Sequence, residues 1–190
     1  MSIVNHAHCH TFIHVPKTAG SAMEQMYFVG GVDHDPMSQL GRSTPADYFT
    51  WAFVRNPYDR AVSTWAAINS PASTKQIRDN FGGCGFEELL LRLHENRETW
   101  QNSLPHFRPQ HWFTHDEHGQ RLLDFIGYFE NIDVDWNRVC LKVIGKYIPL
   151  SKVNATDHRP WREMHTHATI QICNWIYAHD FTLFDYPRIE

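Results

Sequence analysis

The chain has 190 residues, of which 42% are hydrophobic and 20% are charged, proportions that suit one folded domain and exclude a disordered or low-complexity protein. The net charge of −4 argues against a general nucleic-acid-binding surface. Any anion site must therefore be a local group of basic side chains.

Nothing in the sequence indicates a membrane or secreted protein. No apolar run is long enough to span a bilayer, and the opening residues MSIVNHAHCHTF lack the pattern of a secretory signal. Four widely spaced cysteines without a CxxC pair argue against a zinc ribbon or a disulfide scaffold. We therefore expect a cytoplasmic protein.

The apolar pattern predicts alternating strands and helices. Buried strands are expected at residues 11–15, 50–54 and 122–129, and helices at 22–28, 57–67, 86–100, 135–144 and 161–178. Residues 30–45, 70–85 and 149–160 are expected to form loops. This alternation predicts a three-layer α/β fold with a mostly parallel sheet, in a single domain over residues 1–190.

Histidine is unusually frequent, with 14 copies. His6, His8 and His10 alternate near the start, and on a strand they would share one face and form a metal-binding surface. No carboxylate or cysteine completes a recognisable ligand set nearby. We favour the alternative, a polar leader to the first buried strand, and expect no bound metal.

A candidate phosphate loop follows the first strand. Residues 15–21, VPKTAGS, join a buried strand to a helix through small residues, and Lys17 lies within the loop. Loop amides and a helix N-terminus both favour an anion in such a connection. The order GxxxxGK[ST] is absent, so this is not a Walker A loop. The alternative is an ordinary strand–turn–helix connection with a solvated Lys17.

A second basic segment follows the next strand. WAFVRNPYDRAVS at 51–63 places Arg55 at the carboxyl end of the strand and Ser63 on the following helix. Ligands of parallel sheets bind at the carboxyl ends of the strands, so Lys17 and Arg55 are expected to converge there. Arg60 is either a further phosphate ligand or a helix-surface arginine that pairs with Asp59 or Glu24.

These segments resemble a known family. FIHVPKTAGSAM at 12–23 is similar to the 5′-phosphosulfate loop of sulfotransferases that use 3′-phosphoadenosine 5′-phosphosulfate (PAPS), and residues 51–63 are similar to their 3′-phosphate motif. HFRPQ at 106–110, DFIGYFENI at 124–132 and AHDFTLFDY at 178–186 extend the likeness to the carbohydrate branch, Golgi-type and bacterial. The resemblance implies a P-loop, nucleotide-kinase-like fold.

The resemblance also implies an activity and a set of roles. The expected reaction moves a sulfuryl group from PAPS to a hydroxyl or amine, with no metal and with a small molecule or glycan as the acceptor. Lys17 would be catalytic at the bridging oxygen, and Arg55 and Ser63 would hold the 3′-phosphate. The residues expected around the 5′-phosphate are Lys17, Thr18, Ala19, Gly20, Ser21 and Ala22.

The acceptor needs a general base, and His34 is our candidate. It lies between the two nucleotide motifs, as a histidine or glutamate does in many members of this branch, and Asp33 and Asp35 flank it. The alternative is an exposed loop histidine. Glu24 and His14 are the next candidates for the base.

Other residues carry weaker predictions. His106 and Arg108 face the acceptor or serve the loop, and Phe107 and Trp112 stack on a ligand or belong to the core. Asp124 and Glu130 are expected to serve the sheet or cap loops, and Asp124 also resembles a Walker B acid. Lys152 and Arg159 are candidate contacts to the nucleotide.

Two other functions remain open at this point. One is a P-loop kinase that acts on a small molecule, which would depend on ATP and magnesium. The other is a non-catalytic, nucleotide-binding member of the fold. The missing Walker A order argues against the first, and the joint presence of Lys17, Arg55 and Ser63 argues against the second.

Overall fold

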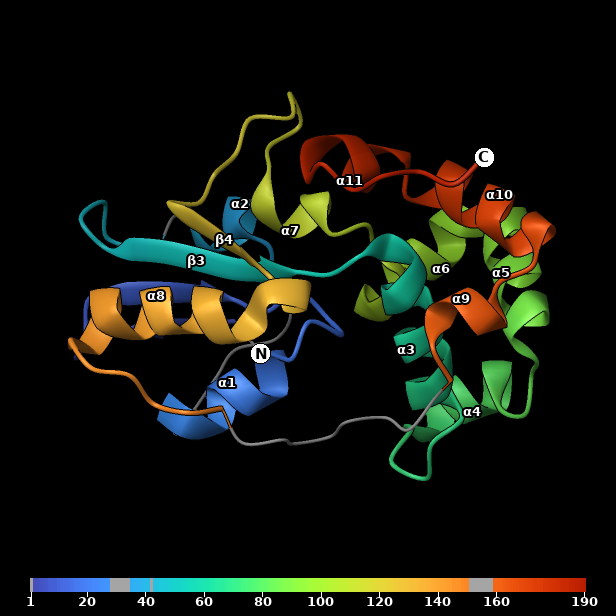
Figure 1. Ribbon diagram of the computed structural model, residues 1–190, viewed down its shortest axis with the longest axis horizontal. Helices are drawn as coiled ribbons and strands as arrows, with labels where there is room; N and C mark the ends of the chain where they lie inside the picture. The colour runs from blue at the N-terminus through green and yellow to red at the C-terminus, as the bar shows by residue number, and fades with distance from the viewer. Residues whose placement is uncertain (1, 28–34, 42, 151–158) are drawn as a thin grey trace. The chain divides into compact units, whose positions relative to one another are not determined.

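The computed structural model describes residues 2–27, 35–41, 43–150 and 159–190 of the chain, without the side chains of 25–27. The chain forms two compact units. The first comprises Met1–Arg55 and Gln110–Asn154, and the second comprises Asn56–Pro109 and Ala155–Glu190. The sheet lies in the first unit, and the second is helical (Figure 1). That residues 1–190 act as a single domain stays a prediction.

The first unit is built on a four-stranded sheet in the order β1-β2-β3-β4. β1 (Ile3–Asn5) pairs antiparallel with β2 (His10–Ile13). β2 pairs parallel with β3 (Phe49–Val54), which pairs parallel with β4 (Phe125–Tyr128). The predicted α/β class with a mostly parallel sheet is therefore confirmed, and the structure adds β1.

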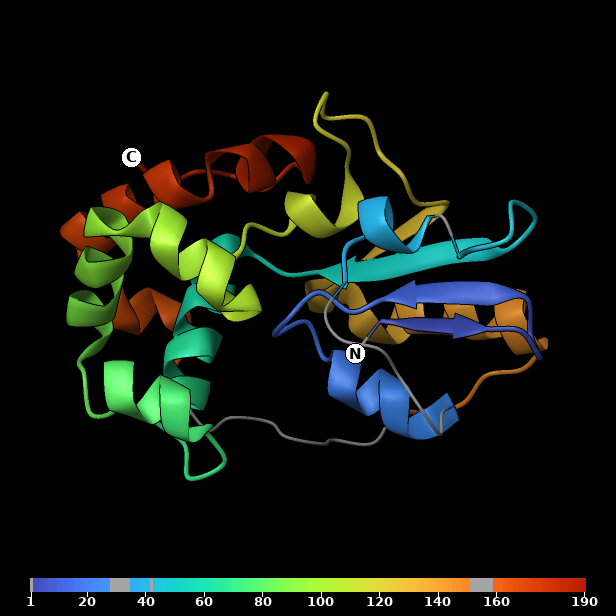
Figure 2. The ribbon, with the colours of Figure 1, turned by 180° about the vertical axis from the view of Figure 1, so that it is seen from behind.

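Large aromatic side chains cover one face of this sheet. Trp51 and Phe53, two residues apart on β3, pack against Trp136 of α8 (Ile132–Ile144) and the neighbouring α1 (Gly20–Tyr27). Both helices lie on this side of the sheet in Figures 1 and 2. Side chains alternate between the faces of a strand, so every second residue of β3 contributes to this layer.

Smaller side chains cover the opposite face. Ile13 and Ala52 point there and pack with α2 (Met37–Leu40) and with Phe113 of α7 (His111–Thr114). The helices on this side complete three layers. In β4, a Cβ atom at Gly127 would lie 2.6 Å from the Phe53 ring, so the closely packed aromatic leaves room only for glycine.

A side-chain link fixes β3 to the start of β4. The Thr50 amide and hydroxyl donate to Asp124 Oδ2 at 2.8 and 2.9 Å, and the Asp124 amide donates to Thr50 Oγ1 at 2.9 Å. Asp124 precedes β4 and so lies at the amino end of the parallel strands. The prediction that it serves the sheet agrees with these contacts, and the Walker B comparison is wrong because such an acid follows its strand.

The N-terminal histidines do not share a strand face. Residues 6–9 form the turn between β1 and β2, so His6 and His8 lie in the turn while His10 lies in β2, 1% exposed. His10 Nδ1 accepts from Trp51 Nε1 at 3.2 Å, and burial lowers the pKa of His10 to about 4. Within the described ranges, no three His, Cys, Asp or Glu residues are placed to hold a metal.

The helices of the second unit differ from the prediction in three places. The expected loop at 70–85 contains a helix, the expected helix at 86–100 is two helices that meet at Asn96, and the one at 161–178 is interrupted at residues 165–166. Thr74 caps the unexpected helix, and Thr166 starts the later one with a capping box. The helices are α3 (Pro57–Ile68), α4 (Lys75–Phe81), α5 (Phe86–Glu95), α6 (Arg97–Ser103), α9 (Trp161–Met164), α10 (His167–Ile176) and α11 (Ala178–Leu183).

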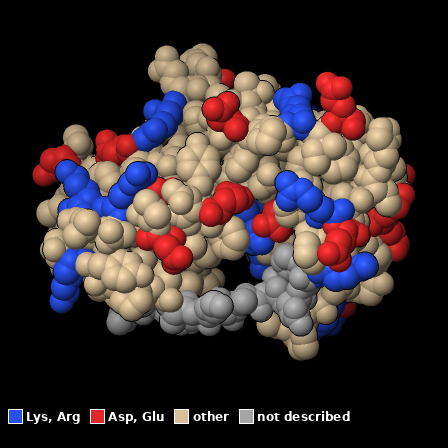
Figure 3. Space-filling model, viewed as in Figure 1, with Lys and Arg blue, Asp and Glu red and all other residues tan. Residues whose placement is uncertain are grey.

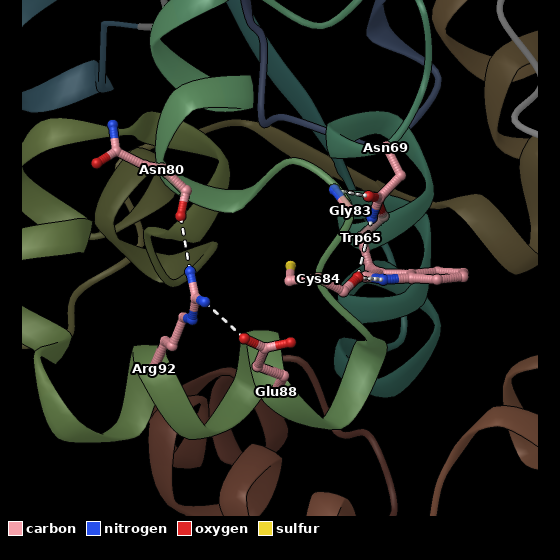
Figure 4. A network of polar contacts seen from close by, with 7 residues as sticks. All are labelled: Trp65, Asn69, Asn80, Gly83, Cys84, Glu88 and Arg92. Atoms are coloured by element: carbon pink, nitrogen blue, oxygen red, sulfur yellow. Dashed lines mark hydrogen bonds and ion pairs between the residues drawn. The ribbon is translucent and has the colours of Figure 1, made fainter.

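The turn that follows α4 is fixed by polar contacts to α3 (Figure 4). The Cys84 carbonyl accepts from Trp65 Nε1 at 2.9 Å and from Asn69 Nδ2 at 3.4 Å, while Asn69 Oδ1 accepts from the Gly83 amide at 2.9 Å. Gly83 has φ +78°, which favours glycine. These contacts fix the turn at residues 83–84, while Phe81 at the end of α4 is buried in the core of the unit.

Tyr58 organises the core of the second unit. Its ring is fully buried and stacks on Trp161 with centroids 5.2 Å apart. Its hydroxyl donates to Asn174 Oδ1 at 2.5 Å and accepts from the Ile189 amide at 2.9 Å, and burial raises the pKa of the phenol. One side chain therefore joins α3, α10 and the segment after α11.

The four cysteines are free thiols, and Cys9 is the exposed one. In the part of the chain that is described, no helix has both the length and the apolar character needed to cross a bilayer.

We expect Thr50→Val to lower the free energy of unfolding by about 1–3 kcal/mol, because it removes the hydroxyl that bonds twice to Asp124 and leaves partly buried polar groups unpaired. Urea unfolding of the full chain measures this. Thr182→Val, which removes an exposed hydroxyl on α11, is the control and should change stability by less than about 0.5 kcal/mol. Equal effects of the two variants would contradict the assigned role of the link.

Candidate functional site

The loop between β2 and α1 has a strained backbone. Lys17 and Ala19 adopt left-handed conformations, with φ +72° and +68°, although neither is glycine. Each such residue costs about 1 kcal/mol or more and is retained where surrounding structure imposes it. Left-handed residues within a turn direct successive amides into one concavity, which suits an anion. Thr18 braces the loop internally, since its buried hydroxyl donates to the carbonyl of Val15, which also follows β2, at 2.9 Å.

Gly20 begins α1 directly against a histidine. A Cβ atom at this position would lie 2.2 Å from His14 Cδ2 and 2.3 Å from His14 Nε2. The imidazole therefore occupies the space that any other side chain would need. The amides of Ala22 and Met23 in the first turn of α1 donate to the Ala19 carbonyl at 3.0 and 3.3 Å, so the helix continues directly from the loop. Glycine here allows the helix to begin close to the end of β2.

His14, which follows β2, is held by the carboxylate of Glu24 on α1. Its Nδ1 lies 2.7 Å from Glu24 Oε1, and its amide donates to Ser2 Oγ at 3.1 Å. The His14 side chain is 7% exposed and that of Glu24 is 21% exposed. The two reserve candidates for the general base thus contact each other beneath the loop, where they support its junction with α1.

Arg55 reaches the same loop from the end of β3. The residue is 8% exposed, and its Nη1 donates to the Lys17 carbonyl at 3.3 Å. The guanidinium carbon lies 4.0 Å from the centroid of the Phe129 ring, at the start of the 3₁₀ turn Phe129–Asn131. The structure therefore brings Lys17 and Arg55 together at the carboxyl ends of parallel strands, as the sequence pattern predicts.

Two residues around Arg55 were missed as parts of the site. Gln110 bonds to both main-chain groups of Arg55, and Phe129 lies under its guanidinium. Both occur in segments that resemble the family, HFRPQ and DFIGYFENI, but a glutamine or a phenylalanine alone gives no chemical signal. Their position within these family-like segments is the signal that could have identified them.

Ser63 and Arg60 both lie on α3 in the second unit and are buried. Arg60 is 1% exposed, and its Nη2 donates to the carbonyls of Arg108 at 2.8 Å and His106 at 3.3 Å. The interpretation of Arg60 as a surface arginine is therefore wrong. Its charge is used to hold the backbone of the 106–108 segment, because a buried guanidinium needs acceptors.

The residues proposed near the acceptor have structural contacts. Arg108 Nε donates to the Gln101 carbonyl at 2.8 Å and its Nη2 to the Asn102 carbonyl at 3.2 Å, at the C-terminal end of α6. Phe107 lies in the core of the second unit. Trp112, in the first unit, is 41% exposed and remains available for stacking.

The remaining predicted residues divide into two groups. His34 and Lys152 lie outside the described residues. Arg159 and Glu130 are exposed.

On the face drawn in Figure 3, Lys and Arg side chains alternate with Asp and Glu rather than form one basic surface. That Lys17 and Arg55 form a local anion site stays a prediction.

Comparison with known proteins identifies the class. The family model described as the sulfotransferase family matches residues 2–187 of this chain. The chain belongs to the sulfotransferase family, and it is an enzyme that transfers a sulfuryl group. No curated protein and no solved structure matches significantly.

We expect Gly20→Ala to destabilise the chain by about 1–3 kcal/mol, because the added methyl group overlaps the His14 ring. Thermal unfolding measures the effect, and Gly85→Ala, where an added Cβ meets nothing within 4 Å, is the control. The double variant His14→Ala/Gly20→Ala should be more stable than the sum of the two single changes predicts. Strict additivity would show that the imidazole is not what excludes a side chain.

Proposed function

We propose that this sulfotransferase uses PAPS as its donor and sulfates a hydroxyl or amine of a carbohydrate or similar small molecule. The observation that best supports this proposal is the hydrogen bond from the Arg55 guanidinium to the Lys17 carbonyl. It places a planar cation beside the loop between β2 and α1, which we propose as the phosphate loop. A nucleotide with phosphates at both its 5′ and 3′ positions needs two such neighbouring groups. A simple phosphate loop would provide one.

The loop suits the 5′-phosphosulfate. Lys17 and Ala19 are left-handed, Ser21 is half-buried and α1 begins at Gly20, an arrangement in which main-chain amides would donate to a phosphate. Thr18 and Ala22 are buried, so their side chains pack inside the protein and support this loop. The family match favours this use of the loop over the alternative small-molecule kinase, for which the GxxxxGK[ST] order is missing.

Arg55 suits the 3′-phosphate. A guanidinium donates two parallel hydrogen bonds to a phosphate, and Phe129 beneath it leaves its edge as the bonding direction. Ser63 is the proposed second ligand of that phosphate, by position in the motif at 51–63. Selectivity for the 3′-phosphate would distinguish this site from one that binds ATP.

The proposed chemistry needs little beyond positioning and charge. Lys17 would stabilise negative charge on the phosphate oxygen as its bond to sulfur breaks, and the fixed loop amides would hold the phosphate in line. His34 would take the proton of the acceptor as the new oxygen–sulfur or nitrogen–sulfur bond forms. We also propose a cytoplasmic location, which the free thiols fit.

Titration calorimetry should give tighter binding of 3′,5′-ADP than of 5′-AMP, and Arg55→Ala should remove that preference. The loss should be roughly ten- to hundredfold for 3′,5′-ADP, the size of a hydrogen bond to a charged group, and much smaller for 5′-AMP. Arg138→Ala, which removes an exposed arginine from the same unit, is the control. Equal binding of both nucleotides by the unaltered protein would overturn the PAPS proposal.

His34→Ala should lower kcat by about 10²–10⁴-fold while 3′,5′-ADP affinity stays unchanged, because a base acts on the acceptor rather than on the nucleotide. Product release from PAPS in the presence of a panel of sugars and amino sugars measures turnover. His118→Ala, at an exposed position, is the control. Loss of turnover in Glu24→Gln with full activity in His34→Ala would transfer the role to the His14–Glu24 pair.

A further inference from the structure

Gln110 makes an unusual pair of hydrogen bonds to the main chain of Arg55. Its Oε1 accepts from the Arg55 amide at 2.8 Å, and its Nε2 donates to the Arg55 carbonyl at 2.7 Å. The side chain comes from the residue that precedes α7 and is completely buried. A carboxamide that satisfies both groups of one residue acts as a neighbouring strand would, one residue beyond the end of β3.

This contact determines where the Arg55 side chain starts. Two short bonds to one residue restrict its backbone dihedral angles, and the dihedral angles set the direction of the Cα–Cβ bond. The far end of the side chain is held separately by the Lys17 carbonyl and the Phe129 ring. Arg55 is therefore fixed at both ends, and rotation at its Cα would displace the guanidinium by more than the movement of the backbone.

Another buried glutamine makes no such contact. Gln101, on α6, is 4% exposed, and its buried Nε2 has no hydrogen-bond partner in the described part of the chain. Burial of a glutamine in this protein thus does not by itself produce a two-bond clamp. The geometry at Gln110 matches one particular residue, and that residue carries the charge proposed to bind the 3′-phosphate.

We propose that Gln110 is a positioning residue that aims the Arg55 guanidinium at the 3′-phosphate of the nucleotide. The inference rests on the proposed function of Arg55. Gln110 itself touches no ligand in this scheme and acts through the main chain of Arg55. A glutamine that only stabilised the fold would affect all ligands alike, whereas a positioning residue affects the ligand that carries a 3′-phosphate.

The test compares two nucleotides in the full-length protein. Gln110→Met keeps the length of the side chain but removes both bonds, so we expect about tenfold weaker binding of 3′,5′-ADP and less than about twofold change for 5′-AMP. Gln110→Glu keeps the acceptor and loses the donor, and should retain more of the preference than the methionine variant. Gln101→Met is the matched control and should leave both affinities unchanged. Thermal unfolding of each variant confirms folding, and Gln110→Glu carries the test if the methionine variant does not fold.

A double variant separates the two proposals. If Gln110 acts through Arg55, Gln110→Met adds no further loss of 3′,5′-ADP affinity in an Arg55→Ala background. Additive losses, or equal weakening of both nucleotides by Gln110→Met, would overturn the positioning role while the role of Arg55 stands. An Arg55→Ala variant that binds 3′,5′-ADP like the unaltered protein would overturn both.

Discussion

A buried guanidinium constrains its surroundings, because a desolvated charge is costly unless acceptors or an aromatic face surround it. Arg55 meets this requirement with the carbonyl of Lys17 and the ring of Phe129, one from the loop after β2 and one from the end of β4. The loops that follow all three parallel strands are thereby joined through one side chain. The relative placement of these loops, and with it the proposed anion site, depends on that connection.

The second constraint is steric and acts on the backbone. Lys17 and Ala19 adopt a conformation that disfavours side chains, while Gly20 leaves the space in which the His14 ring lies. The strained backbone at Lys17 and Ala19 and the close packing at Gly20 occur in the same short turn. Its energetic cost is offset by the surrounding sheet, in which Trp51 and its aromatic neighbours are fully packed. A rigid layer beneath a strained loop is a common arrangement for holding a ligand.

The sequence predicted the parts of this protein that depend on local pattern. Short apolar runs gave three strands, and the basic residues at their ends gave Lys17 and Arg55. It failed where long-range contacts decide the outcome. The turn after α4 bonds to Asn69 while Phe81 of α4 enters the core, and Arg60 is buried where it donates to a carbonyl 48 residues away. Gln110 was missed for the same reason, since its partner lies 55 residues away.

The first unit is discontinuous in sequence, which has a consequence for how the chain folds. β3 and β4 pair across the whole 56–109 segment, and the Thr50–Asp124 link joins residues 74 positions apart. Such non-local pairing slows folding, because the intervening chain must be closed into a loop first. During synthesis, β3 therefore emerges well before the strand that covers its edge, and an uncovered hydrophobic edge is prone to pair with other chains.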